Sequence, residues 1–472
     1  MGKIEDYFYE QKCEKILPER VLQFGEGNFL RAFVDYFIDL LNGQDVFNGS
    51  IVVVQPIEHG LIDELNSQKG LYTVLLRGLE NGKPVTEKRV VTSISRGIDP
   101  YRDYREFIEL AGNADLRYII SNTTEAGIAF VESDKFDDEP QSSFPGKVTR
   151  LLYERYEKLG KGSADAKGFI FIPCELIDNS GDELKKAVLK YAEHWNLSKG
   201  FIDWVHSDNY FANTLVDRIV TGYPKDEAVS LFEEFEYEDN LLVTAENFNF
   251  FAIEAGGKWA EQLKRDMPFW QAGVNAIVTE DVTPYKQRKV RILNGAHTMS
   301  VLAAFLAGHE TVGEMMSDPL FVKYLRQGIF NEIIPTLDFE MDNLKNFADS
   351  VFDRFANPHI KHYLLSIALN SVSKFRARVL PSILEYYKRK GRLPECLTLS
   401  FAALVKFYKS DDAKDDQEIL DFMKAATVTE ICARVDYWGF DLNELGLGKK
   451  VSELLEDIED RGIEVVIKNE IF

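Results

Sequence analysis

Short runs of β-branched and aromatic residues alternate with amphipathic segments along the first half of the chain. Five such runs have the apolar composition of strands buried in a parallel sheet: residues 21–24, 51–55, 73–77, 118–121 and 169–172. A Gly, Pro, Asn or Thr residue follows each run directly. This alternation is typical of βαβ units, so we predict a doubly wound α/β domain that binds its ligand beyond the carboxyl ends of the strands.

From about residue 225 the pattern changes to apolar residues at helical spacing. The clearest helical stretches are 281–306, 320–334, 360–372 and 380–390, and only residues 463–467 have the composition of a strand. We therefore predict a Rossmann-type domain over residues 1–225, followed by a mostly α-helical domain over residues 226–472. The length of 472 residues agrees with two domains, because single hydrophobic cores stop growing at roughly 250–300 residues.

The charge of the chain argues against two classes of binding partner. Lys and Arg number 55 against 77 Asp and Glu, a net charge of −22, which repels nucleic acids and anionic membranes. No apolar run reaches the roughly 18–20 residues of a membrane-spanning helix. The four cysteines are widely spaced and the N-terminus has no signal pattern, so we predict a cytoplasmic protein. We expect a monomer or small homo-oligomer that acts on a small molecule. An anionic substrate would need cations of its own in the pocket.

A glycine pair follows the first predicted strand and precedes an amphipathic segment, residues 31–41. The residues of this turn are Phe24, Gly25, Gly27, Asn28 and Phe29. Two glycines let the backbone turn sharply and approach a pyrophosphate, whose charge is met by the N–H groups of the following helix. Leu30 replaces the third glycine of the full motif, and an ordinary tight turn is the alternative. The place of the turn in the first βαβ unit favours a dinucleotide.

Residues after two further strands refine this prediction. Glu58 follows the second strand, and no Lys or Arg directly follows it. An acid near this point favours the ribose hydroxyls of NAD over the phosphate of NADP, although Glu58 also fits an exposed loop. Asn122, Thr123 and Glu125 follow the strand at 118–121 and are placed to contact the nicotinamide or its ribose. We therefore predict NAD as the cofactor.

Lys289, Asn294 and His297 stand at intervals of five and three residues in one predicted helix. At about 100° per residue their side chains lie at roughly 0°, 140° and 80°, on one broad side of an α-helix. Reduction of a carbonyl needs a proton donor and a donor to the developing oxyanion, which lysine and asparagine can supply without a metal ion. Taken singly, the three residues also fit a capping lysine, a core asparagine and a core histidine.

Three ordered motifs together resemble the mannitol dehydrogenase family of long-chain polyol dehydrogenases. The run K-x5-N-x2-H is similar to the active-site motif of that family, residues 24–32 to its nucleotide turn, and FANTLVDRI at 211–219 to a hallmark centred on V-D-R. Longer stretches are similar to its sugar-acid branch: SNTTEAGI at 121–128, IPCELID at 172–178 and KHYLLSIALNSVSKFRARVL at 361–380. The resemblance covers nearly the whole chain and thins in the last fifty or so residues.

The resemblance implies a metal-independent enzyme that interconverts tagaturonate and altronate with NAD. It implies that Lys289 is the general acid and base, that Asn294 holds the oxyanion, that His297 orients the substrate and that Asp217 faces the site. Lys374 matches a lysine that the family points into its pocket. Further cations near it in the sequence are Arg354, Arg376, Arg378 and His362, and a guanidinium suits a carboxylate through two parallel hydrogen bonds.

One position departs from the family pattern. Relatives often carry Asn after a cysteine and an acid, and that Asn helps to bind the reacting oxygen, whereas this chain has Leu176 there. Asn179 is the candidate replacement, and a plain turn residue is the alternative. Three other functions stay open: the same chemistry on fructuronate and mannonate, a neutral polyol as substrate, and a dinucleotide-binding protein without catalysis.

Overall fold

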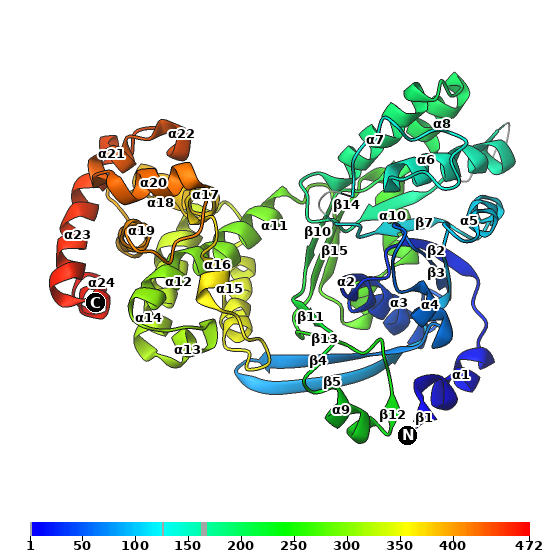
Figure 1. Cartoon of the computed structure of the whole chain (residues 1–472), viewed down its shortest axis with the longest axis horizontal. Coiled ribbons are helices and arrows are strands. Elements are labelled where there is room, and N and C mark those ends of the chain that lie inside the picture. Colours follow the sequence, from blue (N-terminus) through cyan, green and yellow to red (C-terminus); the bar gives the residue numbers. More distant parts are fainter. Residues whose placement is uncertain (1, 125–126, 162–167) are drawn as a thin grey trace. The chain divides into compact units, whose positions relative to one another are not determined.

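Six parallel strands form the central sheet of the computed structural model, which describes residues 2–124, 127–161 and 168–472 (Figure 1). In spatial order they are β6 (Ile94–Ile98), β3 (Ser50–Val54), β2 (Glu19–Phe24), β7 (Tyr118–Ser121), β8 (Ile170–Pro173) and β9 (Tyr210–Phe211). Four of the five predicted strands are here, within a residue or two of their predicted ends. The carboxyl ends of β3, β2, β7 and β8 therefore meet at one edge.

Successive residues of these strands enter two different hydrophobic cores. Val21 lies in the core that also holds Phe33 and Phe37, whereas Leu22 lies in the core that holds Val148 and Leu184. The helices on the two faces include α3 (Val34–Gly43), α6 (Phe144–Arg155), α7 (Ser180–His194) and α8 (Lys199–Asp208). Both faces of the sheet are covered, which explains why its strands are apolar without alternation and confirms the doubly wound Rossmann-type fold.

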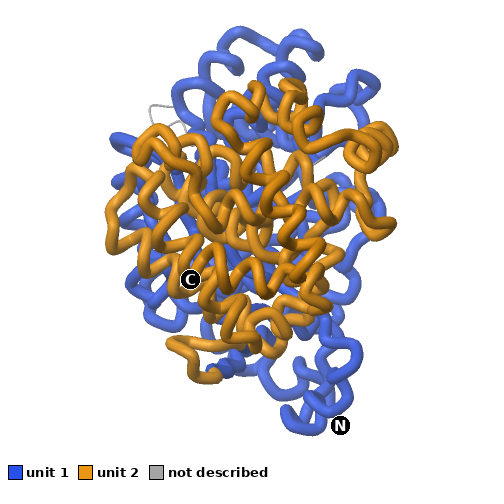
Figure 2. The backbone as a smooth tube through the Cα atoms, turned by 90° about the vertical axis from the view of Figure 1, so that its left-hand side faces the viewer, with its two compact units in different colours: residues 1–77, 85–282 blue, residues 78–84, 283–472 orange. Residues whose placement is uncertain are grey.

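The chain divides into two compact units, shown in Figure 2. Unit 1 is formed by residues 1–77 and 85–282, and unit 2 by residues 78–84 and 283–472. The boundary predicted at residue 225 falls inside unit 1, because later strands complete sheets begun earlier. β14 (Phe250–Glu254) pairs with β10 (Thr214–Asp217), and β13 (Val243–Ala245) pairs with β4 (Tyr72–Glu80).

Several predicted elements differ from those observed. The run at 73–77 is a strand, but β4 belongs to a separate sheet with β5 (Lys83–Val91), β11 (Val220–Gly222) and β13. The helix predicted at 31–41 is divided into α2 (Asn28–Arg31) and α3, because Phe33 leaves helical geometry with φ −126° and ψ −92°. The strand predicted at 463–467 is wrong: these residues lie in α24 (Ile463–Ile471).

The remaining elements of unit 1 are short. They are β1 (Gly2–Lys3), α1 (Ile4–Glu14), α4 (Ile62–Ser67), α5 (Tyr104–Glu109), α9 (Ala228–Phe235), β12 (Tyr237–Glu238), α10 (Gly257–Asp266) and β15 (Ala276–Thr279). β15 extends the pair of β10 and β14 into a three-stranded sheet. The predicted change to an all-helical pattern at residue 225 therefore overlooked four strands of two to five residues, β12 to β15, which are too short for a clear period of two.

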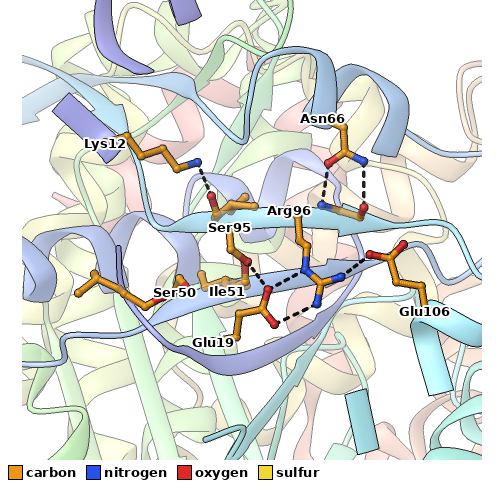
Figure 3. Close-up of polar contacts among 11 residues, drawn as sticks. Lys12, Glu19, Ser50, Ile51, Asn66, Ser95, Arg96 and Glu106 are labelled. Carbon is orange, nitrogen blue, oxygen red and sulfur yellow. Dashed lines mark hydrogen bonds and ion pairs between the residues drawn. The ribbon is translucent and has the colours of Figure 1, made fainter. Parts of the chain in front are cut away.

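Side chains hold β6, the outermost strand on one side of the central sheet (Figure 3). Arg96 donates from Nε and Nη2 to the two carboxylate oxygens of Glu19 at 2.8 and 3.1 Å, and its Nη1 donates to Glu106. The Asn66 amide pairs with the backbone of Gly97, donating at 2.9 Å and accepting at 2.8 Å. The backbone groups of an edge strand are open to unwanted pairing, and here Asn66 takes up those of Gly97.

Apart from residues 78–84, which belong to β4, β5 and the turn between them, unit 2 is built from helices. Its elements are α11 (Thr283–Arg288), the π-helical segment η4 (Lys289–Asn294), α12 (Gly295–Leu306), α13 (Val312–Ser317), α14 (Pro319–Gln327), the π-helical segment η5 (Gly328–Ile333), α15 (Met341–Phe355), α16 (Leu364–Ile367), α17 (Ser371–Arg378), α18 (Leu380–Lys390), α19 (Glu395–Tyr408), α20 (Gln417–Ala425), α21 (Val428–Cys432), α22 (Val435–Trp438), α23 (Leu447–Arg461) and α24. The helix predicted at 380–390 is confirmed as α18. The helix predicted at 360–372 is interrupted, because Asn370 adopts a left-handed φ of 53°.

Two helices form the core of unit 2. Helices α12 and α19 are buried around nearly their whole circumference and pack against each other, as expected for helices that are apolar on every side. The buried carboxylate of Glu332 accepts hydrogen bonds from the backbone N–H groups of Cys396 at 2.9 Å and Leu397 at 3.0 Å, at the start of α19. Burial raises the pKa of Glu332 to about 7.

The raised pKa of Glu332 makes the stability of unit 2 dependent on pH. The folded state keeps this proton to higher pH than the unfolded state, so the stabilisation present below the ordinary pKa is lost as the pH rises through about 7. We expect Glu332→Gln to remove this loss, which is on the order of 2–3 kcal/mol. Denaturant unfolding at about pH 5 and about pH 8 measures it, with Glu453→Gln, at an exposed acid of α23, as the control. An unchanged pH dependence in Glu332→Gln would contradict this assignment.

Candidate functional site

The turn after β2 passes unusually close to β7. Gly25 has a φ of +113°, and a Cβ at this position would lie 2.9 Å from the backbone oxygen of Asn122. The Gly25 N–H donates to the Val54 carbonyl of β3 at 3.2 Å. Only glycine accepts both the backbone conformation and the close approach. The first glycine of the predicted motif is therefore required by the ends of three neighbouring strands.

The second glycine has a different environment. A Cβ at Gly27 would meet no atom of the described residues within 4 Å, so a ligand can approach the backbone at this point. Phe24 is buried and packs against Phe107 and Phe144. Phe29 stacks on Phe33 with ring centroids 4.9 Å apart. The two predicted aromatic residues thus hold the turn in place by packing, while the side of the turn at Gly27 stays open.

Asn28 fixes the helix that follows the turn. Its Oδ1 accepts a hydrogen bond of 2.7 Å from Nη2 of Arg31, and Nε of Arg31 donates to the backbone oxygen of Glu26 at 3.1 Å. Arg31 is buried, so the turn and α2 are joined by a buried network. Asn28 therefore shapes the predicted nucleotide turn through Arg31.

A buried carboxylate organises the end of β7. Glu175, 3% exposed, accepts hydrogen bonds from the Ser121 hydroxyl and from the N–H and hydroxyl of Thr123, all at 3.1 Å. Asn122 Nδ2 donates to the Cys174 carbonyl at 2.7 Å. Burial raises the pKa of Glu175, and these hydrogen bonds oppose the rise. The Cys174 carbonyl therefore ties Asn122, and the Glu175 carboxylate ties Thr123, to the end of β8. Glu125, predicted for the same role, lies outside the described residues.

Asn179 lies at the entry to α7. It is exposed and has a left-handed backbone with φ 54° and ψ 45°. Asparagine adopts this conformation more readily than most residues, which accounts for its presence in the turn. Leu176, in the place of the family asparagine, is 66% exposed. The role of Asn179 as a hydrogen-bond donor to substrate stays a prediction.

The segment around V-D-R is largely structural. Arg218 is buried and donates to the Ala32 carbonyl at 2.7 Å, the Phe248 carbonyl at 3.1 Å and the Asn247 carbonyl at 3.2 Å. It therefore links the junction of α2 and α3 to the turn before β14. Asp217, at the end of β10, is 5% exposed. The predicted role of Asp217 toward substrate is not tested by these contacts.

Asn213 of the same segment caps α7. Its Oδ1 accepts hydrogen bonds from the N–H groups of Gly181 at 3.1 Å and Asp182 at 3.2 Å, and its Nδ2 donates to the Asp182 and Glu254 carboxylates. We expect Asn213→Ala to lower the free energy of unfolding by about 2 kcal/mol, because it removes a helix cap and leaves buried groups without partners. Denaturant unfolding measures this, with the exposed Asn331→Ala as the control. A loss no larger than that of the control would show that Asn213 is not a cap.

Lys289 and Asn294 are the first and last residues of η4. The angles predicted from a regular α-helix are therefore wrong for this pair, because a π-helical turn holds more residues than an α-helical one. Such turns occur often at functional sites. Both side chains are half-buried.

Arginines anchor η4 to neighbouring helices. Arg288 hydrogen-bonds Asn343, and its guanidinium lies 4.3 Å from the Phe347 ring. Arg291 donates to the Ser382 hydroxyl at 2.7 Å and to the Thr336 hydroxyl at 2.9 Å. Arg288 and Arg291, one and two residues from the predicted catalytic lysine, thus fix η4 to α15 and α18.

His297 lies between two rings and has one unused nitrogen. Its ring stacks on Phe355 with centroids 4.0 Å apart at 12°, and meets the His362 ring edge-on at 5.5 Å. Nε2 is buried and has no hydrogen-bond partner among the described residues. Burial lowers the pKa of His297 well below its ordinary value, and neighbouring positive charges lower it further. The imidazole is therefore neutral at physiological pH and offers Nε2 to a ligand.

The pKa of His297 is lowered further by a group of bases that we call the cationic cluster: Arg354, Arg378, Lys374 and His362. Burial lowers the pKa of His362 itself, so the lasting positive charge comes from the two arginines and the lysine. Arg354 is 6% exposed, and Lys374 Nζ donates to the Ile367 carbonyl at 2.8 Å. Arg378 is half-buried, and in the part of the chain that the structure describes its one hydrogen bond is a long contact of 3.5 Å to the Thr298 hydroxyl. Arg376 is exposed and donates to the Asp436 carbonyl. The structure thus brings together all the predicted cations of this region except Arg376.

Within residues 2–124, 127–161 and 168–472, no three His, Cys, Asp or Glu side chains are grouped so that they could hold a metal ion. No helix in the described ranges is long and apolar enough to cross a membrane.

The sequence matches two family descriptions and many curated proteins. Residues 19–266 match the mannitol dehydrogenase Rossmann domain, and residues 281–457 match the mannitol dehydrogenase C-terminal domain. The chain is 46% identical over 472 residues to the altronate oxidoreductase of Escherichia coli O139:H28 (strain E24377A / ETEC), with 96% of each chain covered. It is 45% identical to the altronate oxidoreductase of Shigella flexneri, again with 96% of each chain covered.

Solved structures share the fold at lower identity. A D-sorbitol dehydrogenase in substrate-free form has a TM-score of 0.82 at 22% identity, with 96% of both chains covered. Mannitol 2-dehydrogenase of Pseudomonas fluorescens, solved with NAD and D-mannitol, has a TM-score of 0.68 at 23% identity, covering 96% of this chain and 94% of that one.

Proposed function

The chain belongs to the mannitol dehydrogenase family of oxidoreductases that act on CH–OH groups, and we propose that it interconverts D-tagaturonate and D-altronate with NAD as the hydride carrier. Relatives that share 46% of its residues over 96% of its length are altronate oxidoreductases. The observation that carries the substrate class is the cationic cluster around His297. The whole chain has a net charge of −22, yet several bases surround the neutral imidazole of His297. This local arrangement suits a substrate that bears a carboxylate.

The glycine turn of unit 1 fits a dinucleotide. Gly25 is required by the close approach of β7, and open space beside Gly27 leaves the backbone accessible to a pyrophosphate. Asn122 and Thr123, held by Cys174 and Glu175, are the candidates for contacts to the nicotinamide half. Bound NAD supplies the acceptor or donor of the hydride.

The residues of unit 2 supply the acid–base chemistry in this proposal. In the reduction, Lys289 gives a proton to the carbonyl oxygen as the hydride reaches the carbon, and in the oxidation it removes the hydroxyl proton. Asn294 donates a hydrogen bond to the oxygen as negative charge develops there. The unpartnered Nε2 of His297 binds a substrate hydroxyl. Asp217 and Asn179 stay proposed substrate contacts.

The cationic cluster holds the carboxylate. Arg378 suits this role best, because its guanidinium has only the long contact to Thr298 within the described residues and its planar fork matches a carboxylate. Lys374 and Arg354 add charge at the same place. A neutral polyol offers no negative charge to these bases, so we prefer an acid over a polyol as substrate.

We also propose that the enzyme works in the cytoplasm. Its cysteines, Cys13, Cys174, Cys396 and Cys432, are all free thiols, which is usual in a reducing compartment. The proposal requires no oxidising environment for folding.

Replacement of Lys289 tests the mechanism. We expect Lys289→Ala to lower kcat by about a hundredfold to ten-thousandfold, the usual share of a general acid or base. The dissociation constant of this variant for NADH, measured by fluorescence without substrate, should stay within about twofold. The control is Lys345→Ala, at an exposed lysine of α15, in which kcat and the NADH dissociation constant should both stay within about twofold. Near-normal turnover by Lys289→Ala would end the proposed mechanism.

Replacement of Arg378 tests the substrate class. We expect Arg378→Gln to lower kcat/KM for tagaturonate by about a hundredfold, the effect of removing one partner of a hydrogen-bonded charge pair. The activity toward fructose, a neutral ketose, should change by less than about threefold, because no carboxylate is lost. Arg376→Gln is the matched control on the same helix, since Arg376 is exposed and bonded to Asp436. A wild-type preference for fructose over tagaturonate and fructuronate would refute the carboxylate pocket.

A further inference from the structure

Glu26, between the two glycines of the turn, has a buried side chain that points toward the segment after β3. It is 8% exposed. Its Oε1 accepts a hydrogen bond of 3.1 Å from the N–H of Leu61. A Cβ at Gly60 would lie 2.0 Å from the same oxygen, so glycine at this position makes room for the carboxylate. The turn and the segment after β3 are therefore fitted to each other through Glu26.

The second carboxylate oxygen of Glu26 has no partner. Oε2 is buried, and no donor among the described residues reaches it. Burial raises the pKa of Glu26, and the N–H groups of Leu61 and of Glu26 itself, together with the charge of Arg31, oppose the rise. Buried polar atoms in proteins are nearly always hydrogen-bonded, and an exception calls for an explanation. A ligand hydroxyl that donates to Oε2 would complete its hydrogen bonding.

The location of Glu26 indicates which hydroxyl this is. In a Rossmann-type sheet the adenosine ribose lies at the end of the second strand, next to the glycine turn. That strand is β3 here, and the residues that follow it, from Gln55 to Leu61, include no Lys or Arg. Glu58, the acid predicted for this role from the sequence, is exposed. Glu26 is the acid that is both buried and short of a hydrogen-bond donor.

We infer that Glu26, supplied by the glycine turn itself, binds the adenosine ribose hydroxyls and selects NAD over NADP. This rests on the proposed use of NAD. The two ribose hydroxyls donate to the carboxylate, whereas the 2′-phosphate of NADP would bring negative charge against a buried carboxylate with no cation after β3 to compensate. One turn thus serves two purposes, with Gly27 open to the pyrophosphate and Glu26 facing the ribose.

The test compares Glu26→Gln with wild type. Glutamine keeps an oxygen for the Leu61 N–H, so the turn retains its internal bond. We expect the dissociation constant and KM for NADH to rise about tenfold and those for NADPH to fall about tenfold, since a charged acceptor and a charge repulsion are both removed. Asp63→Asn, at an exposed acid of α4, is the matched control and should leave the preference unchanged.

Dissociation constants measured without substrate separate this inference from the choice of substrate. An unchanged preference for NADH over NADPH in Glu26→Gln would overturn the inference while leaving the proposed function intact. A change of this preference in Glu58→Gln instead would have the same meaning. Failure of the wild type to bind NADH would overturn both. Thermal unfolding identifies a misfolded variant, and Glu26→Ala then serves in its place with the same expected direction. Activity with another uronate would leave the result for Glu26 unaffected.

Discussion

The close approach of the β2 turn to β7 is the constraint on which the cofactor side of the molecule depends. At Gly25 a single added carbon would lie 2.9 Å from the Asn122 oxygen, so the two strand ends cannot separate or shift without losing their fit. Asn122 is in turn bonded to Cys174, and Thr123 to Glu175. The ends of three strands are therefore held as one rigid edge, and a ligand that binds there meets groups whose positions were fixed during folding.

The cationic cluster of unit 2 follows a different physical logic. Bases gathered around a buried imidazole repel one another and keep that imidazole neutral. Asp415 offsets part of this repulsion at Lys374, and in the proposed function a bound carboxylate lowers it further, which adds to the binding energy. The large negative charge of the whole chain then acts against binding at long range, and the local cations must outweigh it at short range.

The sequence predicted the parts of this structure that depend on local pattern. Apolar runs identified four strands of the central sheet, and the glycine pair marked the turn, because the buried strands and the positive φ at Gly25 each leave a signature in neighbouring residues. It also predicted Lys374 and Arg354 as members of one site, which the structure brings to His297. What it missed depends on long-range contacts: Phe355 against His297 joins distant helices, and Glu175 bonds a different strand end.

One wrong prediction, the strand at 463–467, could have been avoided from the sequence itself. Residues 463–467 have a strand-like composition, yet the buried positions Ile463, Val466, Ile467 and Ile471 follow the spacing of an amphipathic helix. The π-helical segment η4 had no such signal, since no residue type specifies it.

The π-helical segment also sets a limit on how this site can change in evolution. A widened turn is equivalent to one residue inserted into an α-helix, so restoring regular winding without deleting a residue would rotate everything before η4 by about 100°. Arg288 and Lys289 would turn together, and the anchor of Arg288 on Asn343 would be lost along with the orientation of the lysine. The interval of five residues between Lys289 and Asn294 and the widened turn are therefore linked, and evolution can remove one only together with the other.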